Sequence, residues 1–583
     1  MSISKRVKFL LILSSVLGFW QGLSFAQSSP DQARILENLS PVSDAMLVNP
    51  PANDWLMWRR TYDGFGFSPL NQINRENVDE LQLAWRVGLE SGSNMPTPLV
   101  HDGVMYLLST QDTLLAMDAT SGDLLWNHKH EGAGIGSPKI GIALHGNMVL
   151  VPTGDMHMLA LDSKTGSVLW DTEIVTTNTG RVPYSLRAAP MIANGMVIQG
   201  VTATMMPEGG FIVGLNIDNG EEIWRFHSIA RPGAPGGNTW NDAPLAERTG
   251  GSVWVPGSYD PELDLIYYGL APTYDTGTLL YPVDKAGINS DALYTNSTVA
   301  LRPKTGELIW HFQHMANDQW DLDWVYERQL IEMPVDGVDR KIVLTAGKMA
   351  LYDAVDAATG EYLFSMDMGL QNLVSAIDPV TGAKTVNANA MPNAEDTQLV
   401  CPFANGGRNW QAASYNPNTK MLYLPLSEVC MNGGPTGVGG LLSSGAMMSA
   451  TPLPDSDGKF GRLQAINLGD RELGWTYREV VSPTTSALAT AGGVVFEGAL
   501  DESFKAFDDA TGEILWRTDL GDIPASFPIS YSVDGRQYIA VVIGQPSIHA
   551  NTMMGVIAGF LGDDNPFVSL SRSGAALLVY ALE

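Results

Sequence analysis

The stretch LLAMDATSGDLLW, residues 114–126, is the clearest copy of a motif that recurs along the chain. In each copy an alternating apolar segment leads into a polar turn that ends in glycine, and an aromatic residue follows. Further copies are MLALDSKTGSVLW (158–170), IVGLNIDNGEEIW (212–224), VALRPKTGELIW (299–310), DAATGEYLF (356–364) and FKAFDDATGEILW (504–516), with degenerate copies LQLAW (81–85) and LGWTY (473–477). The aromatic positions are Trp85, Trp126, Trp170, Trp224, Trp310, Phe364, Trp475 and Trp516.

This repeat predicts an all-β fold. Alternation with a period of two is typical of a half-buried strand, and the turn residues favour a tight reversal of the chain. A small antiparallel sheet cannot bury both of its faces alone, so such units stack around an axis until the ring closes. Eight aromatic positions therefore predict an eight-bladed β-propeller in which each aromatic side chain docks against a neighbouring blade. We interpret these aromatic residues as structural.

Two intervals between successive aromatic residues are too long for one blade, which needs about 40 to 50 residues. They lie between Trp224 and Trp310 and between Phe364 and Trp475. Long insertions in a rigid scaffold often carry function. These two segments are therefore the first places to search for a site.

The N-terminus has the features of an export signal. Three cations, Lys5, Arg6 and Lys8, precede an apolar run over residues 9–19, and small residues surround Ala26. The run is shorter than the roughly 20 residues that span a bilayer, which argues against the alternative of a membrane anchor. We expect a signal peptide over residues 1–26, cleavage after Ala26, a periplasmic protein, and one propeller domain over residues 27–583.

The net charge of -29 over 583 residues describes an acidic protein. Such a charge disfavours nucleic acids and anionic membranes and would attract a basic protein partner, although it could serve solubility alone. Cys401 and Cys430 are the two cysteines of the sequence, and an oxidising compartment makes a disulfide between them the default. The absence of a C-x-x-C-H motif excludes a covalently attached c-type haem, and no cysteine follows the signal to carry a lipid.

Four stretches outside the repeat carry a resemblance to a known family. They are NDWLMWRRTYDGFGFSPLNQINRENVDELQLAW (53–85), GGSVWVPGSYDPELDLIYYG (250–269), WHFQHMANDQWDLD (310–323) and CPFANGGRNW (401–410). Together they resemble the soluble quinoprotein alcohol dehydrogenases, which use pyrroloquinoline quinone (PQQ). The resemblance implies that PQQ lies on the propeller axis against a tryptophan, beside a metal ion and an aspartate that acts as general base.

The resemblance assigns roles to four residues. Trp254 matches the tryptophan on which the quinone lies, with a core tryptophan as the alternative. Asp321 matches the catalytic aspartate and a metal ligand, with a solvated turn aspartate as the alternative. Asp323 is similar to the extra metal ligand of the lanthanide-using branch, which suits a hard trivalent ion. Lys348 aligns with the cation that faces the quinone oxygens, with a surface lysine as the alternative.

Weaker matches add four cofactor-binding candidates. Asn409 and Trp410 match a segment that closes over the edge of PQQ, although a turn with its own satisfied donors explains them equally well. Thr202 and Arg187 align less securely, and an arginine there would suit a PQQ carboxylate.

The sequence also departs from the family. The glutamate and asparagine that bind calcium align with Met205 and Pro272, which offer no hard oxygen ligand from their side chains. Glu208, Thr273 or Asp275 could replace the missing oxygens, or Lys348 could take over part of the role of the ion. A calcium or lanthanide ion therefore remains the expected metal, with an open ligand set.

The adjacent pair of cysteines found near the cofactor in many members of the family is also absent, because residues 132–144 contain no cysteine. This difference implies a wider or differently shaped entrance and an unusual alcohol, bulky or secondary. The resemblance predicts an alcohol dehydrogenase that passes electrons to a separate cytochrome c. Two alternatives are a non-catalytic envelope propeller scaffold and a glycosidase or lyase built on Asp321 and Asp323 in one strand.

Overall fold

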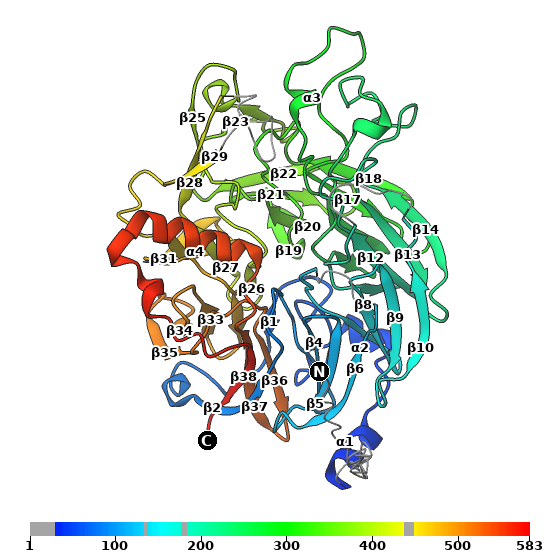
Figure 1. Ribbon diagram of the computed structural model, residues 1–583, viewed down its shortest axis with the longest axis vertical. Coiled ribbons are helices and arrows are strands. Elements are labelled where there is room, and N and C mark those ends of the chain that lie inside the picture. Colours follow the sequence, from blue (N-terminus) through cyan, green and yellow to red (C-terminus); the bar gives the residue numbers. More distant parts are fainter. Residues whose placement is uncertain (1–29, 133–136, 177–183, 436–447) are drawn as a thin grey trace, which may run out of the picture.

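The computed structural model describes residues 30–132, 137–176, 184–435 and 448–583, so the predicted signal peptide and its cleavage site lie outside the described residues. Within this part of the chain, eight sheets contain four or five strands each and surround a common centre (Figure 1). Neighbouring strands within each of the eight are antiparallel except for β1 and β32, and the strands follow chain order except for β1 and β2. This arrangement confirms the predicted all-β propeller architecture.

The first four of these sheets follow one another along the chain. Their strands are β3 (Leu99–His101), β4 (Val104–Ser109), β5 (Thr113–Asp118) and β6 (Leu124–Lys129); β7 (Ala143–His145), β8 (Met148–Pro152), β9 (His157–Asp162) and β10 (Val168–Glu173); β11 (Met191–Ala193), β12 (Met196–Val201), β13 (Phe211–Asn216) and β14 (Glu222–His227); β15 (Ser258–Asp260), β16 (Leu265–Gly269), β17 (Ser297–Leu301) and β18 (Leu308–Gln313).

The other four sheets complete the set. Their strands are β19 (Gln329–Val335), β20 (Val338–Ala346), β21 (Leu351–Asp356) and β22 (Tyr362–Asp367); β26 (Ser414–Asn416), β27 (Met421–Ser427), β30 (Gly461–Asn467) and β31 (Glu472–Glu479); β32 (Leu488–Thr490), β33 (Val494–Gly498), β34 (Ser503–Asp508) and β35 (Ile514–Asp519), extended by β1 (Phe67–Ser68); β36 (Ile529–Val533), β37 (Arg536–Ile543) and β38 (Ala576–Ala581), closed by β2 (Gln82–Gly88). Each predicted aromatic residue lies in the last strand of a different sheet, or in β2.

Contacts between the repeat glycines and the preceding aromatic residues join neighbouring sheets. Trp310 in β18 donates a hydrogen bond from Nε1 to the carbonyl of Ala357, which follows β21 in the next sheet. Gly360 in that turn has a φ of +74°, and a Cβ atom there would lie 2.6 Å from the ring of Trp310. Glycine is therefore required both for the backbone conformation and for the approach of the indole. The same contact joins Gly122 to Trp85, Gly166 to Trp126, Gly220 to Trp170, Gly306 to Trp224 and Gly512 to Trp475. Below, these pairs are called the rim contacts.

The N- and C-terminal parts of the described chain share one sheet. Strand β2 pairs with β38 in antiparallel register from Gln82 opposite Ala581 to Gly88 opposite Ala576. Strand β1 pairs in parallel with β32, another strand from the C-terminal part of the chain. The ring is thus closed by hydrogen bonds between segments from opposite ends of the sequence.

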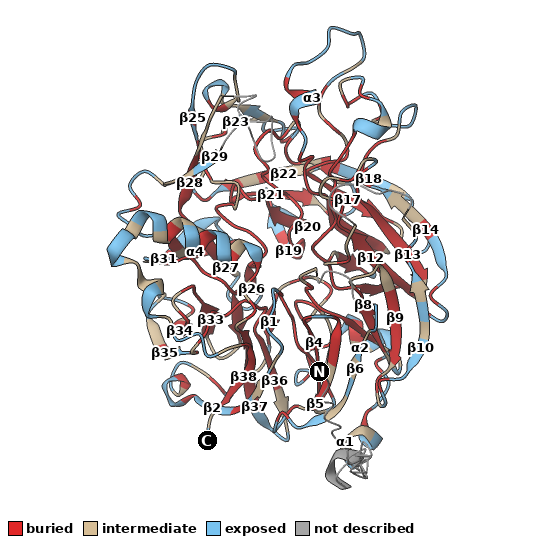
Figure 2. Ribbon diagram, viewed as in Figure 1, coloured by how far each residue is buried: buried red, intermediate tan, exposed pale blue. Residues whose placement is uncertain are grey.

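Burial increases from the outer strands to the inner ones (Figure 2). The first strand of the early sheets, for example β3 or β11, is buried at every position, whereas the last strand, for example β6 or β10, alternates between exposed and partly buried residues. The interior therefore forms from strands that are apolar on both faces.

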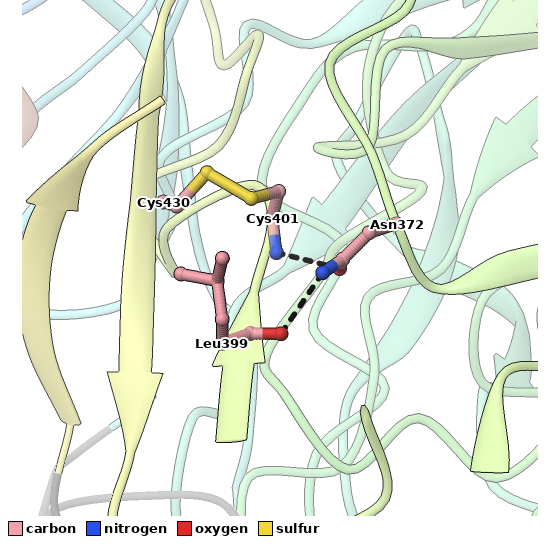
Figure 3. Close-up of a disulfide and its surroundings, with 4 residues drawn as sticks. All are labelled: Asn372, Leu399, Cys401 and Cys430. Carbon is pink, nitrogen blue, oxygen red and sulfur yellow. Dashed lines mark hydrogen bonds between the residues drawn. A yellow bond between two sulfur atoms is a disulfide. The ribbon is translucent and has the colours of Figure 1, made fainter. Parts of the chain in front are cut away.

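The segment between β22 and β30 carries its own small sheets, as the long interval after Phe364 predicts. These are the pair β23 (Val374–Ile377) and β24 (Lys384–Val386), and the three strands β25 (Gln398–Val400), β28 (Val429–Gly433) and β29 (Met448–Pro452). The predicted disulfide between Cys401 and Cys430 is present beside β25 and β28. Asn372 holds the backbone next to this disulfide. Its side chain accepts a hydrogen bond from Cys401 N and donates one to Leu399 O (Figure 3).

Helices are few and short. The α-helices are α1 (Pro30–Asn38), α2 (Asp44–Val48), α3 (Gly277–Leu280) and α4 (Ile548–Leu561), and the 3-10 helices are η1 (Val78–Glu80), η2 (Leu245–Glu247), η3 (Ala388–Ala390), η5 (Gly562–Asp564) and η6 (Pro566–Ser569). Among the described residues, no helix combines the length and the apolar character needed to cross a bilayer. Helix α4 belongs to a connection between β37 and β38.

Candidate active site

Antiparallel topology brings the candidate residues to one face of the ring. The loops that enter the first strand of a sheet and the loops between its second and third strands lie at the same end of the strands. Trp254 precedes β15, Asp321 and Asp323 precede β19, Lys348 lies between β20 and β21, and Trp410 precedes β26. We call the loops 252–257, 318–328, 347–350 and 405–413 the central loops.

Lys348 joins the two aspartates of the DQWDLD stretch. Its Nζ atom lies 3.3 Å from Oδ1 of Asp321 and 3.1 Å from Oδ1 of Asp323, and it donates a hydrogen bond of 2.8 Å to the carbonyl of Asp321. All three side chains are buried. A buried ammonium between two carboxylates compensates charges that would be costly if left unpaired. The structure therefore brings together the three candidate residues for acid-base chemistry.

A local network determines the shape of the loop that carries these aspartates. The carboxylate of Asp318 accepts hydrogen bonds from Trp320 N at 2.8 Å, Leu322 N at 2.7 Å and Asn296 Nδ2 at 2.9 Å. Asp321 itself has a φ of +63°, an uncommon backbone conformation for a residue with a side chain. The two aspartates thus lie in a loop and not in a strand, so the strand geometry assumed for the glycosidase alternative is wrong.

Burial and charge have opposing effects on this cluster. Burial raises the pKa of Asp321 well above its ordinary value, the charge of Lys348 lowers it in part, and the nearby Asp323 raises it again. Burial lowers the pKa of Lys348, but the two carboxylates, first Asp321 and then Asp323, raise it by more. The net pKa of Lys348 therefore lies above its ordinary value. The ammonium is therefore charged, and it is the main group that favours an ionised Asp321.

Trp254 lies next to this cluster. Its Nε1 donates a hydrogen bond of 2.9 Å to Oδ2 of Asp323, and the edge of Tyr326 meets its ring at an interplanar angle of 90°. The imidazole of His549 lies nearly parallel to the indole, at an angle of 18° and a centroid distance of 5.8 Å. Trp254 thus presents a flat apolar surface beside two carboxylates and an ammonium, as expected for the floor of a cofactor site.

Arg187 and Thr202 have polar atoms that the described protein does not satisfy. The Nε atom of Arg187 and the Oγ1 atom of Thr202 are buried, and no described residue forms a hydrogen bond with either. Thr202 follows strand β12, whose last residue Val201 accepts a hydrogen bond from Val253 N, directly before Trp254. Unsatisfied buried donors are costly, which favours a ligand that completes them.

The structure gives Asn409 and Trp410 a different set of partners from the one that the resemblance implies. Asn409 donates from Nδ2 to Asn405 O at 2.7 Å and accepts from Trp410 N at 2.7 Å. The indole of Trp410 donates from Nε1 to Oγ of Ser547 at 3.2 Å. These donors are engaged within the protein, which favours the alternative of a turn with satisfied donors.

Three residues of this face were not predicted from the sequence: Asn405, Ser547 and His549. Ser547 caps helix α4, whose first turn carries His549. Helix α4 lies in neither of the two long intervals that the aromatic spacing singles out, so its position over Trp254 follows from the tertiary structure. The sequence S-I-H before an apolar stretch is the one local signal, since serine favours a helix N-terminus.

The expected metal ligands do not converge on Asp321 and Asp323. Met205 packs with the apolar cluster around Trp254, and the carbonyl of Pro272 accepts a hydrogen bond from Gly251 N. Glu208 is half exposed and faces Arg231, while the hydroxyl of Thr273 pairs with that of Thr249. Among the described residues, the one group of three or more acidic or histidine side chains close enough to share an ion is Asp54, His101 and Asp102, which does not include these two aspartates. The donor set beside Trp254 therefore does not fit a hard metal ion held by the protein alone.

Comparison with known proteins identifies the family. Residues 55–369 and 439–539, more than half of the chain, match the model of the PQQ glucose/ethanol/alcohol dehydrogenase β-propeller domain. The quinohemoprotein alcohol dehydrogenase ADH IIB of Pseudomonas putida is 30% identical over 555 residues, which are 91% of this chain and 78% of that protein. A dehydrogenase subunit of a quinone-linked alcohol dehydrogenase from Komagataeibacter europaeus is also 30% identical, over 90% of this chain and 76% of its own length.

Solved structures agree with the sequence comparison. The quinohemoprotein alcohol dehydrogenase of Comamonas testosteroni aligns with a TM-score of 0.81 and 26% identity, covering 95% of this chain and 84% of that one. A europium-containing methanol dehydrogenase, 24% identical with a TM-score of 0.80, shares the fold. These matches argue against the alternative of a scaffold without enzymatic activity. The chain belongs to the family of PQQ-dependent glucose, ethanol and alcohol dehydrogenases that share this β-propeller domain.

Proposed function

We propose that this protein is a periplasmic dehydrogenase that oxidises an alcohol to the carbonyl compound with PQQ as its cofactor. The observation that carries the proposal is the buried cluster of Asp321, Asp323 and Lys348 beside the flat ring of Trp254. When bound, PQQ supplies the electrophilic centre that accepts the hydride from the alcohol carbon. The protein must then provide a base, a compensating charge and a cofactor surface.

Asp321 is the base in this proposal. Its carboxylate takes the proton of the alcohol hydroxyl as the hydride leaves the carbon, so that the substrate loses two electrons and two hydrogens. The Lys348 ammonium, 3.3 Å away, lowers the pKa of this carboxyl group and so favours its ionised form, although burial and Asp323 leave the pKa above its ordinary value. Asp323 orients Trp254 through the hydrogen bond to Nε1.

Arg187 and Thr202 fit the acidic groups of PQQ. A flat tricarboxylate needs cationic and hydroxyl donors near its edge, and both residues carry buried donors that lack described partners. Trp254 supports one face of the ring system by stacking. Asn409 and Trp410 act indirectly, by holding the first turn of α4 in place through Asn405 and Ser547.

The same cluster of Asp321, Asp323 and Lys348 determines whether the site needs a metal ion. Asp321 and Asp323 are the hard oxygen ligands nearest the proposed cofactor surface, and Lys348 already lies between them. A calcium or lanthanide ion would need further oxygen ligands that Met205 and Pro272 do not provide. We therefore assign the compensating positive charge at this site to Lys348.

Electrons leave for a separate acceptor in this proposal, because the sequence has no C-x-x-C-H motif for a haem of its own. A soluble, basic cytochrome c suits the net charge of -29. The substrate is a bulky or secondary alcohol, in line with the departures from the family around the entrance.

Reconstitution tests the proposal directly. Purified protein would be incubated with PQQ in the presence of calcium, lanthanum or a chelator, and dye reduction would be followed with primary, secondary and bulky alcohols. We expect PQQ-dependent reduction, loss of the reaction in Asp321→Asn, and activity that persists with the chelator. Failure of the wild-type protein to bind PQQ under all three conditions would refute the proposed function.

A further inference from the structure

His549 covers Trp254 at the point where the proposed function needs a cofactor surface. The two rings are nearly parallel, at 18°, and their centroids are 5.8 Å apart. Trp254 comes from the loop before β15 and His549 from helix α4, so segments almost 300 positions apart in the sequence build this pair. No rim contact involves either residue.

Several polar contacts hold the imidazole in this orientation. Nδ1 of His549 lies 3.0 Å from Oδ1 of Asn405, whose Nδ2 donates to the backbone carbonyl of His549 at 3.4 Å. Because Oδ1 can only accept, a hydrogen bond to Asn405 requires a proton on Nδ1 of His549, whereas a hydrogen bond from an amide Nδ2 requires an unprotonated Nδ1. Asn409 Nδ2 lies 3.3 Å from the same nitrogen. One loop, residues 405–409, thus contacts Nδ1 through two side chains and fixes the plane of the ring.

Helix α4 is itself anchored on both sides of His549. Before it, Oγ of Ser547 accepts hydrogen bonds from Trp410 Nε1 and from Ala550 N. After it, Ala550, Met553 and Ile557 pack into an apolar cluster with residues of other sheets, among them Val429, Phe460 and Leu500. The imidazole therefore belongs to the first turn of a helix that contacts the rest of the protein on both sides of His549.

The ring is also uncharged. Burial, together with the cations Lys348 and Arg187 and against a raising effect of Asp323, lowers the pKa of His549 to about 3. This dependence places the imidazole near both cations of the candidate site. A neutral, flat and buried ring is suited to stacking against another flat ring.

We propose that His549 is a positioning residue for the cofactor, and that its imidazole and the indole of Trp254 hold the flat ring system of PQQ between them. The inference rests on the proposed function. Two stacked layers with carbon atoms about 3.5 Å apart need about 7 Å between the outer rings. The centroid distance of 5.8 Å is an upper limit on the separation of the two planes, so the pair would open by at least about 1 Å through a shift of the first turn of α4.

Binding measurements test this role apart from turnover. Equilibrium titration of PQQ, followed by quenching of tryptophan fluorescence, would compare the wild-type protein with His549→Ala and His549→Phe. We expect His549→Ala to weaken PQQ binding by about tenfold or more, the size of one lost aromatic stacking contact. His549→Phe should restore affinity to within about threefold of the wild type, because it keeps the flat ring while it loses the contact with Asn405.

A matched control separates this role from general loss of structure. His311 lies in the outer strand β18, where its imidazole contacts Tyr294. The variant His311→Ala should leave the affinity for PQQ unchanged. Circular dichroism and thermal melting would establish that each variant is folded. Equal affinity of His549→Ala and wild type would overturn the inference, and so would tighter binding by His549→Ala, which would make His549 a plug. If the wild type binds no PQQ, the proposed function fails first and this inference falls with it.

Discussion

The rim contact at Trp310 and the region around Trp254 differ in whether their buried polar atoms have partners. At the rim, the indole of Trp310 donates to Ala357 O, and the turn carboxylate of Asp356 accepts from the backbone of Ala358 and Thr359. In the central region, Arg187 Nε and Thr202 Oγ1 are buried without a described partner. Satisfied groups stabilise the fold, whereas unsatisfied ones cost stability and persist where a ligand can complete them. The same scaffold therefore separates structure at its edge from chemistry near its centre.

The sharpest way to break this comparison is to neutralise one aspartate in each region. Asp321→Asn removes the proposed base, and alcohol oxidation should fall by about 1000-fold while the melting temperature changes little. Asp356→Asn weakens a repeat turn at the rim and should lower the melting temperature with little effect on kcat/KM. Steady-state kinetics and thermal melting of both variants provide the test. Comparable activity of Asp321→Asn and the wild type would show that the base lies elsewhere.

The stability of the segment between β22 and β30 should depend on its disulfide and not on rim contacts. Replacing Cys401 and Cys430 together with serine frees a loop closed across a sequence separation of 29 residues. The free energy of unfolding should decrease by about 3 kcal/mol. Denaturant titration measures this effect, and the reduced wild-type protein should behave like the double variant. An unchanged unfolding midpoint would mean that the pairing of β25 with β28 stabilises this segment without the disulfide.

The close approach at a rim contact can be separated from backbone strain with two glycines. Gly360 has a φ of +74° and lies against Trp310, while Gly337 has a φ of +80° and a Cβ atom added there would meet nothing within 4 Å. Alanine at Gly337 should cost about 1 kcal/mol from backbone strain alone. Alanine at Gly360 should cost about 2 kcal/mol more, because the methyl group meets the indole. An equal decrease in the free energy of unfolding in the two variants would show that the rim contact does not contribute to stability.

The smallest expected effect is a displacement of the pH profile. Lys348 lowers the pKa of Asp321 against the effect of burial, so Lys348→Met should raise that pKa further. The acid limb of the kcat/KM profile, where the base becomes protonated, should then move to higher pH. Lys384→Met removes another buried ammonium, one that pairs with Asp353 at 2.6 Å, and should lower stability without moving the profile. A displacement of equal size in both variants would contradict a specific role for Lys348.

The sequence predicted the parts of the molecule that repeat or that match a family motif. The aromatic residues of the motif each lie in a separate sheet, and Asp321, Asp323, Lys348 and Trp254 meet beside one another as the resemblance implies. Repetition makes the rim predictable because each copy has the same neighbours. The central loops have no such redundancy.

What the sequence could not predict depends on contacts between distant segments. The position of His549 over Trp254 requires that β37, α4 and β38 be placed relative to a loop of another sheet. The sequence left two readings of Asn409 and Trp410 open, because their partners, Asn405 and Ser547, are brought to them only by the fold. The position of Lys348 between the aspartates, at 3.1 Å and 3.3 Å, likewise depends on loops that precede β19 and β21.

The pairing of β2 with β38 also determines when the molecule can be completed. A chain synthesised from its N-terminus completes β2 early and β38 after the other described strands. Strand β2 must therefore wait as an unpaired edge while almost all other strands arrive, and exposed edges invite association with other chains. Holdase chaperones that shield such edges would matter most for this segment. Once the last strand is in place, the same pairing leaves neither end of the ring free to peel away.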